Sequence, residues 1–226
     1  MLVIPVINIE PLFGNDIEAK MNVARQIDEV CRVSGFFQIK NHGISTQSLE
    51  ALTSKTFDFF QKLTTEQKMS MASKKFNSSN GHLYRGYFPA SVNGKDISSI
   101  EIFYTIVYTL FPLSLNKGKE GFDIGNPTLN ETSDLLKLPC NEVTLWPPKE
   151  VLPDFKDVFT DFYLQFFNLA QTLLRGFALA TGQEEDFFQR YLKIDDTMST
   201  FRLNHYPFLD NIDAIEIAED GTKIGK

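Results

Sequence analysis

The most regular pattern of apolar positions lies near the C-terminal end of the chain, where large apolar residues recur at intervals of three and four. The series is Phe155, Phe159, Phe162, Phe166, Leu169, Leu173, Phe177 and Ala180. This spacing places the side chains on one face of an α-helix. Gly182 follows and can adopt the left-handed conformation that ends a helix. The pattern therefore predicts a helix about 40 Å long whose apolar face packs in a core.

The N-terminal part predicts a strand, a helix and a second strand. Residues 2–9 form a Val- and Ile-rich run, and residues 36–39 form a second one after Gly35. Between them Asn15 and Glu18 predict a capping box at the start of a helix. Apolar residues with helical spacing follow at Ile17, Met21, Ala24, Ile27 and Cys31. This order favours a parallel or mixed sheet with the helix on one face.

The middle of the chain predicts two helices, a hairpin and an irregular segment. One helix begins near Ser45 or Thr46, and Thr64 with Gln67 predicts a capping box for a short second one. The Asn-, Ser- and Gly-rich residues 76–96 predict loops and a hairpin, and residues 100–110 are strand-like. Six of the ten prolines lie in residues 112–153. We therefore interpret 112–153 as an extended crossing segment rather than regular structure.

The last strand-like segments alternate between apolar and polar positions. Phe201 and Leu203 point one way, while Arg202, Asn204 and Tyr206 point the other. A second apolar run spans 212–218. The polar residues could converge on a ligand carboxylate or phosphate. A solvated outer face of an antiparallel sheet produces the same alternation, so both interpretations stay open at this point.

Composition and charge narrow the function classes. The chain has 226 residues, a net charge of −7 and 42% hydrophobic residues. Nucleic-acid binding needs a clustered positive face, which this composition does not favour. The apolar opening is too short to span a bilayer. Two distant cysteines without a secretory signal indicate a reducing compartment. We expect a cytoplasmic protein with no nucleic-acid or membrane partner.

Motifs that carry chemistry are sparse. No phosphate-binding loop, Gly-x-Ser-x-Gly elbow, Cys-x-x-Cys or His-Glu-x-x-His is present. His42, His82 and His205 each lack a His-x-Asp or His-x-Glu partner, so we interpret them as hydrogen-bonded loop or core residues. We therefore expect no catalytic residue and no metal ligand in the chain. A second aromatic and cationic group is Tyr84, Arg85 and Tyr87, for which an exposed loop is the simpler interpretation.

Six segments, in order, resemble the N-terminal region of the isopenicillin-N-synthase-like non-haem iron oxygenases. They are "IPVINIEPLFG", "SGFFQIKNHGI", "LTTEQKM", "RGYFP", "LWPP" and "RLNHYP". The second is the most specific of them, and the Phe-rich helix also fits. The resemblance implies an α+β chain, namely the helix-rich α/β region of a double-stranded β-helix (jelly-roll) oxygenase with the jelly roll incomplete.

The same resemblance implies cofactors and site residues. Relatives hold Fe(II) with a His-x-Asp and a distant His, use O2, and mostly take 2-oxoglutarate, which an Asn-x-Tyr motif helps to hold. Asn204 and Tyr206 match that motif. The expected substrate- and co-substrate-binding set is Asn204, Tyr206, Arg202, Arg85, Tyr84 and Tyr87. The isopenicillin branch has an arginine where this chain has Tyr84, which argues against penicillin formation.

The segment at 220–223 leads, in the family, into the strand that carries the His-x-Asp, whereas this chain ends at Lys226. We expect the N-terminal portion of an oxygenase acting on a small acidic metabolite or peptide, with this chain alone binding no cofactor and inactive. The alternatives are a silent small-acid-binding module and a fragment that pairs with other chains through sheet edges. The expected regions are 1–110 (N-terminal region), 111–153 (crossing segment), 154–198 (long helix and a short one) and 199–226 (first jelly-roll strands).

Overall fold

The computed structural model describes residues 4–92, 95–96, 119–138, 140–206, 215–217 and 223–225. The chain forms two compact units, which are considered separately. Unit 1 comprises Met1–Phe57, Asn126–Asn130 and Pro153–Met198, and unit 2 comprises Asp58–Gly125, Glu131–Leu152 and Ser199–Lys226. The units therefore interleave along the chain, and the four consecutive regions expected from the sequence stay a prediction.

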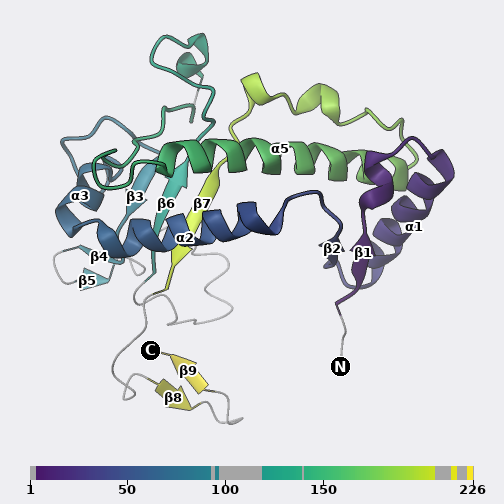
Figure 1. The fold of residues 1–226 in the computed structure, drawn as a ribbon, viewed down its shortest axis with the longest axis horizontal. Helices are drawn as coiled ribbons and strands as arrows, with labels where there is room; N and C mark the ends of the chain where they lie inside the picture. The colour runs from purple at the N-terminus through teal and green to yellow at the C-terminus, as the bar shows by residue number, and fades with distance from the viewer. Residues whose placement is uncertain are drawn as a thin grey trace. The chain divides into compact units, whose positions relative to one another are not determined.

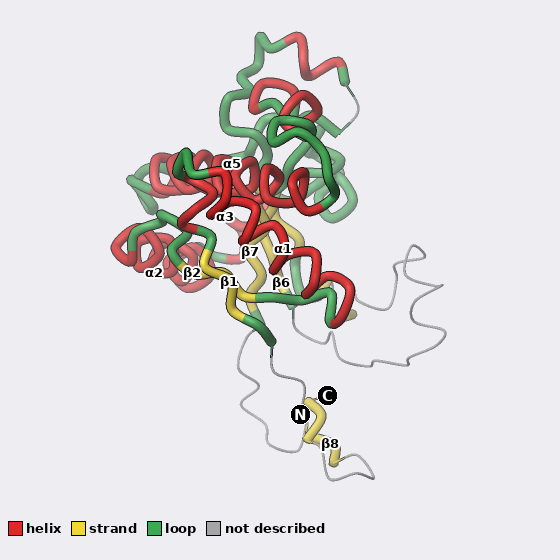
Figure 2. The backbone as a smooth tube through the Cα atoms, turned by 90° about the vertical axis from the view of Figure 1, so that its right-hand side faces the viewer, coloured by secondary structure: helices red, strands yellow, loops and turns green. Residues whose placement is uncertain are grey.

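Unit 1 contains the predicted strand–helix–strand arrangement. Strand β1 (Val6–Asn8) pairs in parallel with β2 (Gln38–Lys40), and the two lie next to each other in Figure 2. The 3-10 helix η1 (Glu10–Phe13) and helix α1 (Ile17–Val33) connect them. The predicted cap at Asn15 is wrong by one residue. Asp16 is the cap, because its carboxylate reaches the backbone N–H groups of Glu18 at 2.9 Å and Ala19 at 3.2 Å.

The long helix α5 (Phe155–Ala180) ends as the sequence predicts. Gly182 has φ 73°, its N–H donates to Leu179 and the next N–H donates to Ala178, which is a Schellman motif. The apolar stripe is confirmed at its start, where three phenylalanines are fully buried. Phe166 is 40% exposed, and Phe167 is buried instead. Tyr163, Phe167 and Ala178 are also buried, so the buried surface of α5 is wider than the single stripe that the spacing predicts.

The core of unit 1 lies between α1, α5 and the parallel strands. Its buried members are Ile7, Ile9, Leu12, Val23, Ile27, Val30 and Leu169. A β-carbon at Gly176 would lie 2.9 Å from Ile27 Cδ1 and 3.0 Å from Leu12 Cδ1. The lack of a side chain at position 176 therefore lets the ends of the Ile27 and Leu12 side chains pack directly against α5. The 3-10 helices η5 (Gln189–Tyr191) and η6 (Ile194–Asp196) follow α5.

Unit 2 is built on a three-stranded antiparallel sheet. Its strands are β3 (Gly86–Phe88), β6 (Glu120–Ile124) and β7 (Phe201–His205), in the order β3-β6-β7, which Figure 1 shows side by side. The central strand β6 lies in the segment that we interpreted as irregular, so that interpretation is wrong for residues 120–124. Glu, Gly and Asp are poor strand formers, and only their partners in the sheet make this segment a strand.

The remaining elements mostly match the sequence. Helix α2 (Thr46–Lys62) starts as predicted, and α3 (Thr65–Ser70) has the predicted Thr64–Gln67 capping box. Strands β4 (Ser91–Val92) and β5 (Lys95–Asp96) form the hairpin, and β8 (Ile215–Ile217) pairs antiparallel with β9 (Lys223–Gly225). The crossing segment also holds the 3-10 helix η4 (Asp134–Lys137). The strand predicted at 100–110 and the hairpin turn at 93–94 lie outside the described residues.

None of the helices within the described ranges combines the length and apolarity that crossing a membrane requires.

Candidate ligand-binding sheet face

The β3-β6-β7 sheet has two faces that differ in chemistry. Successive residues of a strand point to opposite sides, so the register assigns each residue to one face. The packed face comprises Tyr87, Glu120, Phe122, Leu203 and His205. The polar face comprises Phe88, Gly121, Asp123, Arg202 and Asn204. This confirms the predicted alternation for residues 201–205, with Leu203 buried and its neighbours Arg202 and Asn204 exposed.

Three cross-strand neighbours occupy the middle of the polar face. Phe88, Gly121 and Asn204 are cross-strand neighbours. The Phe88 ring lies over Gly121, where a β-carbon would be 2.1 Å from Phe88 Cζ and 2.7 Å from the Leu203 carbonyl oxygen. The Arg202 guanidinium lies 4.9 Å from the centroid of the Phe88 ring, within cation–π range. The lack of a side chain at position 121 therefore leaves room for the end of the Phe88 ring.

Arg202 on this face is paired with Asp123. Its Nε and one Nη donate to the two carboxylate oxygens of Asp123, each at 2.6 Å. The Asp123 side chain is 7% exposed and that of Arg202 is 48% exposed. Such a bidentate pair holds the guanidinium in one orientation and compensates its charge. Arg202 is thus placed on the predicted face, but with its charge already opposed by a buried carboxylate.

Asn204 and Tyr206 are the two exposed groups at the end of this face. Asn204 lies on β7, and Tyr206 follows the last residue of that strand with 65% of its surface exposed. The ammonium group of Lys119 lies 6.0 Å from the centroid of the Tyr206 ring. An amide, a phenol and an ammonium group are chemically suited to a small carboxylate. The predicted binding role of Asn204 and Tyr206 stays a prediction.

The second predicted group, Tyr84, Arg85 and Tyr87, is divided by the fold. Tyr84 is exposed, whereas Arg85 is 6% and Tyr87 4% exposed, so the exposed-loop interpretation is wrong for these two. Arg85 donates to Thr200 Oγ1 and, at 3.3 Å, to the Cys140 carbonyl. Tyr87 lies on the packed face, on the other side of the sheet from Asn204. The structure therefore does not bring the six predicted residues together on one face.

The carboxylate of Glu142 holds the backbone of residues 83–85 in place. Glu142 accepts hydrogen bonds from the backbone N–H groups of Leu83 at 2.7 Å, Tyr84 at 2.9 Å and Arg85 at 3.1 Å. Three N–H groups that converge on one carboxylate fix the course of the backbone. Arg85 and the strand after it are thereby directed into unit 2. Glu142 is 57 residues from Arg85 in sequence, so no local pattern predicts this contact.

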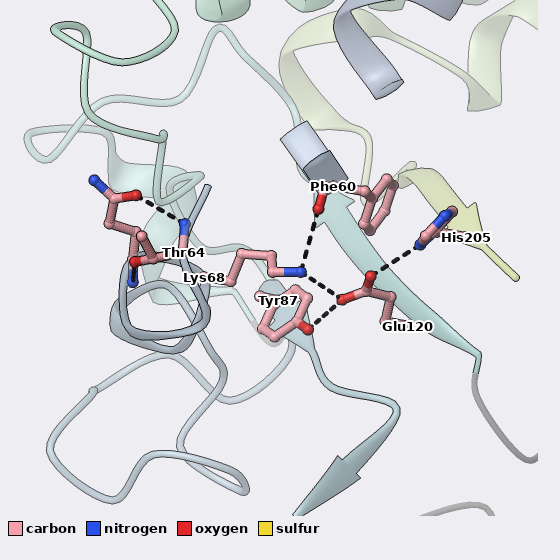
Figure 3. A network of polar contacts seen from close by, with 7 residues as sticks. Phe60, Thr64, Lys68, Tyr87, Glu120 and His205 are labelled. Carbon is pink, nitrogen blue, oxygen red and sulfur yellow. Dashed lines mark hydrogen bonds and ion pairs between the residues drawn. The ribbon is translucent and has the colours of Figure 1, made fainter. Parts of the chain in front are cut away.

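The packed face contains a polar network that the sequence interpretation missed. Figure 3 shows Lys68, Tyr87 and His205 directed at the carboxylate of Glu120. Lys68 Nζ lies 3.0 Å from Glu120 Oε2, which also accepts from the Tyr87 hydroxyl. His205 Nδ1 lies 2.9 Å from Glu120 Oε1. His205 is thus a hydrogen-bonded residue, as predicted, and so is His42, whose Nδ1 accepts from the Ile44 N–H at 3.2 Å.

The protonation states in this network follow from its geometry. Burial by itself raises the pKa of Glu120, but hydrogen bonds from Tyr87, His205 and Lys68 outweigh burial and lower that pKa below its usual value. Burial raises the pKa of Tyr87, and its hydrogen bond to the charged Glu120 raises it further. At neutral pH Glu120 is therefore ionised and Tyr87 keeps its proton. Neither group is poised to exchange a proton near pH 7.

The His, Cys, Asp and Glu side chains of the described residues are the candidate ligands for a metal ion. Within these ranges no three His, Cys, Asp or Glu side chains are placed together to hold a metal ion. A facial iron site needs two imidazoles and a carboxylate on one ion, and His205 uses Nδ1 for Glu120. The described residues therefore do not fit the iron that the family resemblance implies, and we derive no chemical step through it.

Comparison with known proteins decides the family. The family model described as "non-haem dioxygenase in morphine synthesis N-terminal" matches residues 4–149. The chain belongs to this isopenicillin-N-synthase-like, non-haem dioxygenase family. It is 34% identical over 223 residues to isopenicillin N synthase of Flavobacterium sp. (strain SC 12,154), covering 98% of this chain and 61% of the relative. It is 36% identical over 225 residues to isopenicillin N synthase of Penicillium chrysogenum, with 98% and 61% covered.

Solved structures agree on the fold. A 2OG-Fe(II) oxygenase family protein from Caulobacter crescentus superimposes with a TM-score of 0.67 at 18% identity, covering 99% of this chain and 70% of that one. A full-length Neurospora crassa protein, solved in complex with alpha-KG, has a TM-score of 0.65 at 24% identity, covering 91% and 55%. The fold is therefore that of the Fe(II) and 2-oxoglutarate oxygenases. The chain spans about three fifths of the length of the curated relatives it matches.

Proposed function

We propose that this chain is the N-terminal portion of a non-haem Fe(II)-dependent oxygenase or oxidase that acts, with O2, on a small acidic metabolite or peptide. Its membership of the family and its span of 61% of the isopenicillin N synthases support this. In this proposal 2-oxoglutarate is the co-substrate and the iron ligands are residues other than those described. Iron, when bound, would activate O2, and the chain's own residues bind and orient the acid.

The observation that carries the proposal is the polar end of the sheet. Asn204 and Tyr206 are exposed there, at the positions that match the family's Asn-x-Tyr motif. Asp123 compensates the charge of Arg202. Lys119, close to the Tyr206 ring, is then a cation suited to one ligand carboxylate. Asn204 and Tyr206 would donate to the same ligand and set its direction.

A second candidate is a small-acid-binding module that works without iron. The exposed Tyr206 with Lys119 near its ring supports it, because these groups need no iron to bind a carboxylate. Both candidates use the same polar face and differ in whether an oxidation follows binding. Iron content and turnover of the natural gene product therefore separate them, whereas acid binding alone does not.

Titration calorimetry with 2-oxoglutarate tests the binding step. We expect saturable binding by the product of the natural gene, weakened about tenfold by Tyr206→Phe, the scale of one hydrogen bond to a charged group. Tyr191→Phe is the matched control, because Tyr191 is an exposed tyrosine of unit 1 (74%). Equal affinities of the wild type and Tyr206→Phe would contradict the assigned role.

Anaerobic Fe(II) titration with elemental analysis tests the reaction. We expect stoichiometric iron and consumption of 2-oxoglutarate with the product of the natural gene, and no tight iron with the 226 residues alone. Acid binding with no iron in either sample would support the module instead. Stoichiometric iron in the 226-residue chain would show that its own residues form the site.

A further inference from the structure

The network around Glu120 joins three parts of unit 2 at one carboxylate. Tyr87 comes from β3, Lys68 from α3 and His205 from β7, while Glu120 lies on the central strand between β3 and β7 (Figure 3). The Lys68 ammonium also donates to the Phe60 carbonyl at 3.5 Å. The Phe60 ring stacks on the imidazole of His205, with centroids 4.7 Å apart and planes 21° from parallel. The imidazole is thus held at its edge and on one face.

His205 occupies a particular place in the chain. It stands between Asn204 and Tyr206, and the Glu120–His205 pair is the last of the described β6–β7 ladder. Backbone pairing therefore orients β7 up to His205, and Tyr206 follows that pair. Because neighbouring residues of a strand project to opposite sides, a side chain fixed at 205 on the packed face fixes the direction of Asn204. It also anchors the backbone from which Tyr206 continues. His205, which Glu120 holds on the packed face, is thus directly bonded in sequence to both predicted binding residues, Asn204 and Tyr206.

Stability by itself is a weak reason for such a network. The Glu120 and Lys68 side chains are each 11% exposed, and that of His205 is 26% exposed. Removing charges from water costs about as much as their attraction returns, so a buried ion pair contributes little compared with an apolar replacement. The network instead fixes the orientation of the Glu120 carboxylate and of its partners, because Oε1 binds His205 and Oε2 binds Lys68. Rigid support of this kind is what a precise binding site needs.

We propose that Glu120 is a positioning residue for the polar face: through His205 it sets the placement of Asn204 and Tyr206. The part that concerns ligand affinity rests on the proposed function, whereas the part that concerns the order of Asn204 and Tyr206 does not. Glu120 contacts no ligand in this scheme. It acts through the imidazole that it holds.

Two substitutions separate positioning from folding. Glu120→Gln keeps the shape but removes the charge that holds Lys68 and His205. His205→Phe keeps a ring against Phe60 and removes only the bond to Oε1, leaving Glu120 with Tyr87 and Lys68. Glu185→Gln is the control, because it removes one carboxylate from the 2.6 Å Lys20–Glu185 pair in unit 1. Each variant is compared with the wild type at equal fraction folded.

Nuclear magnetic resonance of the ligand-free chain is the first measurement. We expect the side-chain amide of Asn204 and the ring of Tyr206 to become more mobile in Glu120→Gln and His205→Phe, and to be unchanged in Glu185→Gln. Unchanged order at 204 and 206 in a folded His205→Phe chain would overturn the proposal. The result for His205→Phe therefore tests the positioning role even if Glu120→Gln does not fold.

Calorimetry of the product of the natural gene with 2-oxoglutarate is the second measurement. We expect affinity to fall about tenfold in both packed-face variants, the scale of one misplaced hydrogen bond to a charged group, and to stay within about twofold in the control. If the wild type does not bind 2-oxoglutarate, the proposed function fails, while the mobility result still judges the positioning role. If both packed-face variants bind like the wild type and show unchanged order, the positioning role is wrong and the proposed function stands.

Discussion

Two buried carboxylates on strand β6 lie on opposite faces of the sheet, and their cationic partners differ in exposure. Glu120 points to the packed face and holds Tyr87, Lys68 and His205, whereas Asp123 points to the polar face and holds Arg202. Both are buried, but the cation that Asp123 meets is about half exposed. Arg202 can turn to water if its partner is lost, and Lys68 cannot. We infer that the loss of stability on removing a carboxylate depends more on the solvent exposure of its cationic partner than on that of the carboxylate itself.

The largest effect is expected from Glu120→Ala. It would leave the Lys68 ammonium, whose side chain is 11% exposed, without its carboxylate. Breaking a buried pair from one side costs about 3–5 kcal/mol, because the remaining charge stays buried. Urea unfolding followed by circular dichroism measures the loss. A loss below about 1 kcal/mol would mean that water reaches Lys68 and that the two faces do not differ as argued.

Asp123→Ala should cost less, despite the shorter contacts of its ion pair. Arg202 is 48% exposed and can be hydrated after the carboxylate is removed. Partly exposed pairs are worth about 1 kcal/mol or less, to which a modest loss of buried contacts adds. The same urea experiment compares both variants. If Asp123→Ala proves as damaging as Glu120→Ala, the exposure of the partner is not what separates the two sites.

Acid should lower the free energy of unfolding, because Glu120 on the packed face becomes protonated. Its folded-state pKa lies below the unfolded value of about 4.3, so its contribution is fully present above that value and is lost as pH falls through the folded pKa. As the pH falls below about 4.3, the stability of the wild type should fall more steeply than that of Glu120→Gln, which has no carboxylate to protonate at this position. Urea midpoints at successive pH values give both slopes. Parallel curves would show that Glu120 is not stabilised in its charged form.

The smallest effect on stability is expected from Tyr206→Phe on the polar face. The Tyr206 side chain is mostly exposed, so removing its hydroxyl uncovers nothing. The melting temperature should shift by about 1 °C or less, the scale of a surface substitution in a chain of this size. Differential scanning calorimetry measures the shift, with Tyr191→Phe as the matched control. A clear loss of stability would identify Tyr206 as a structural residue rather than a binding one.

Local pattern predicted the parts of the chain whose contacts lie near in sequence. Helical spacing identified α1 and α5, and the Thr64–Gln67 pair identified the start of α3. The predicted parallel pairing is confirmed by β1 and β2. The cap at Asp16 was missed by one position because Asn15 and Asp16 are both good caps, and only backbone geometry distinguishes them.

By itself the sequence determined the helices, the alternating faces of residues 201–205 and, through its motifs, the family. Those features depend on periodicity and on residue types a few positions apart. Only the tertiary structure decided that residues 120–124 form the central strand, because the partners of Glu120 and Asp123 lie 85 and 79 residues away. Glu120 and Asp123 favour solvent until a distant histidine and arginine satisfy them. A strand of this composition is stable only inside its sheet, so no local signal could have identified it.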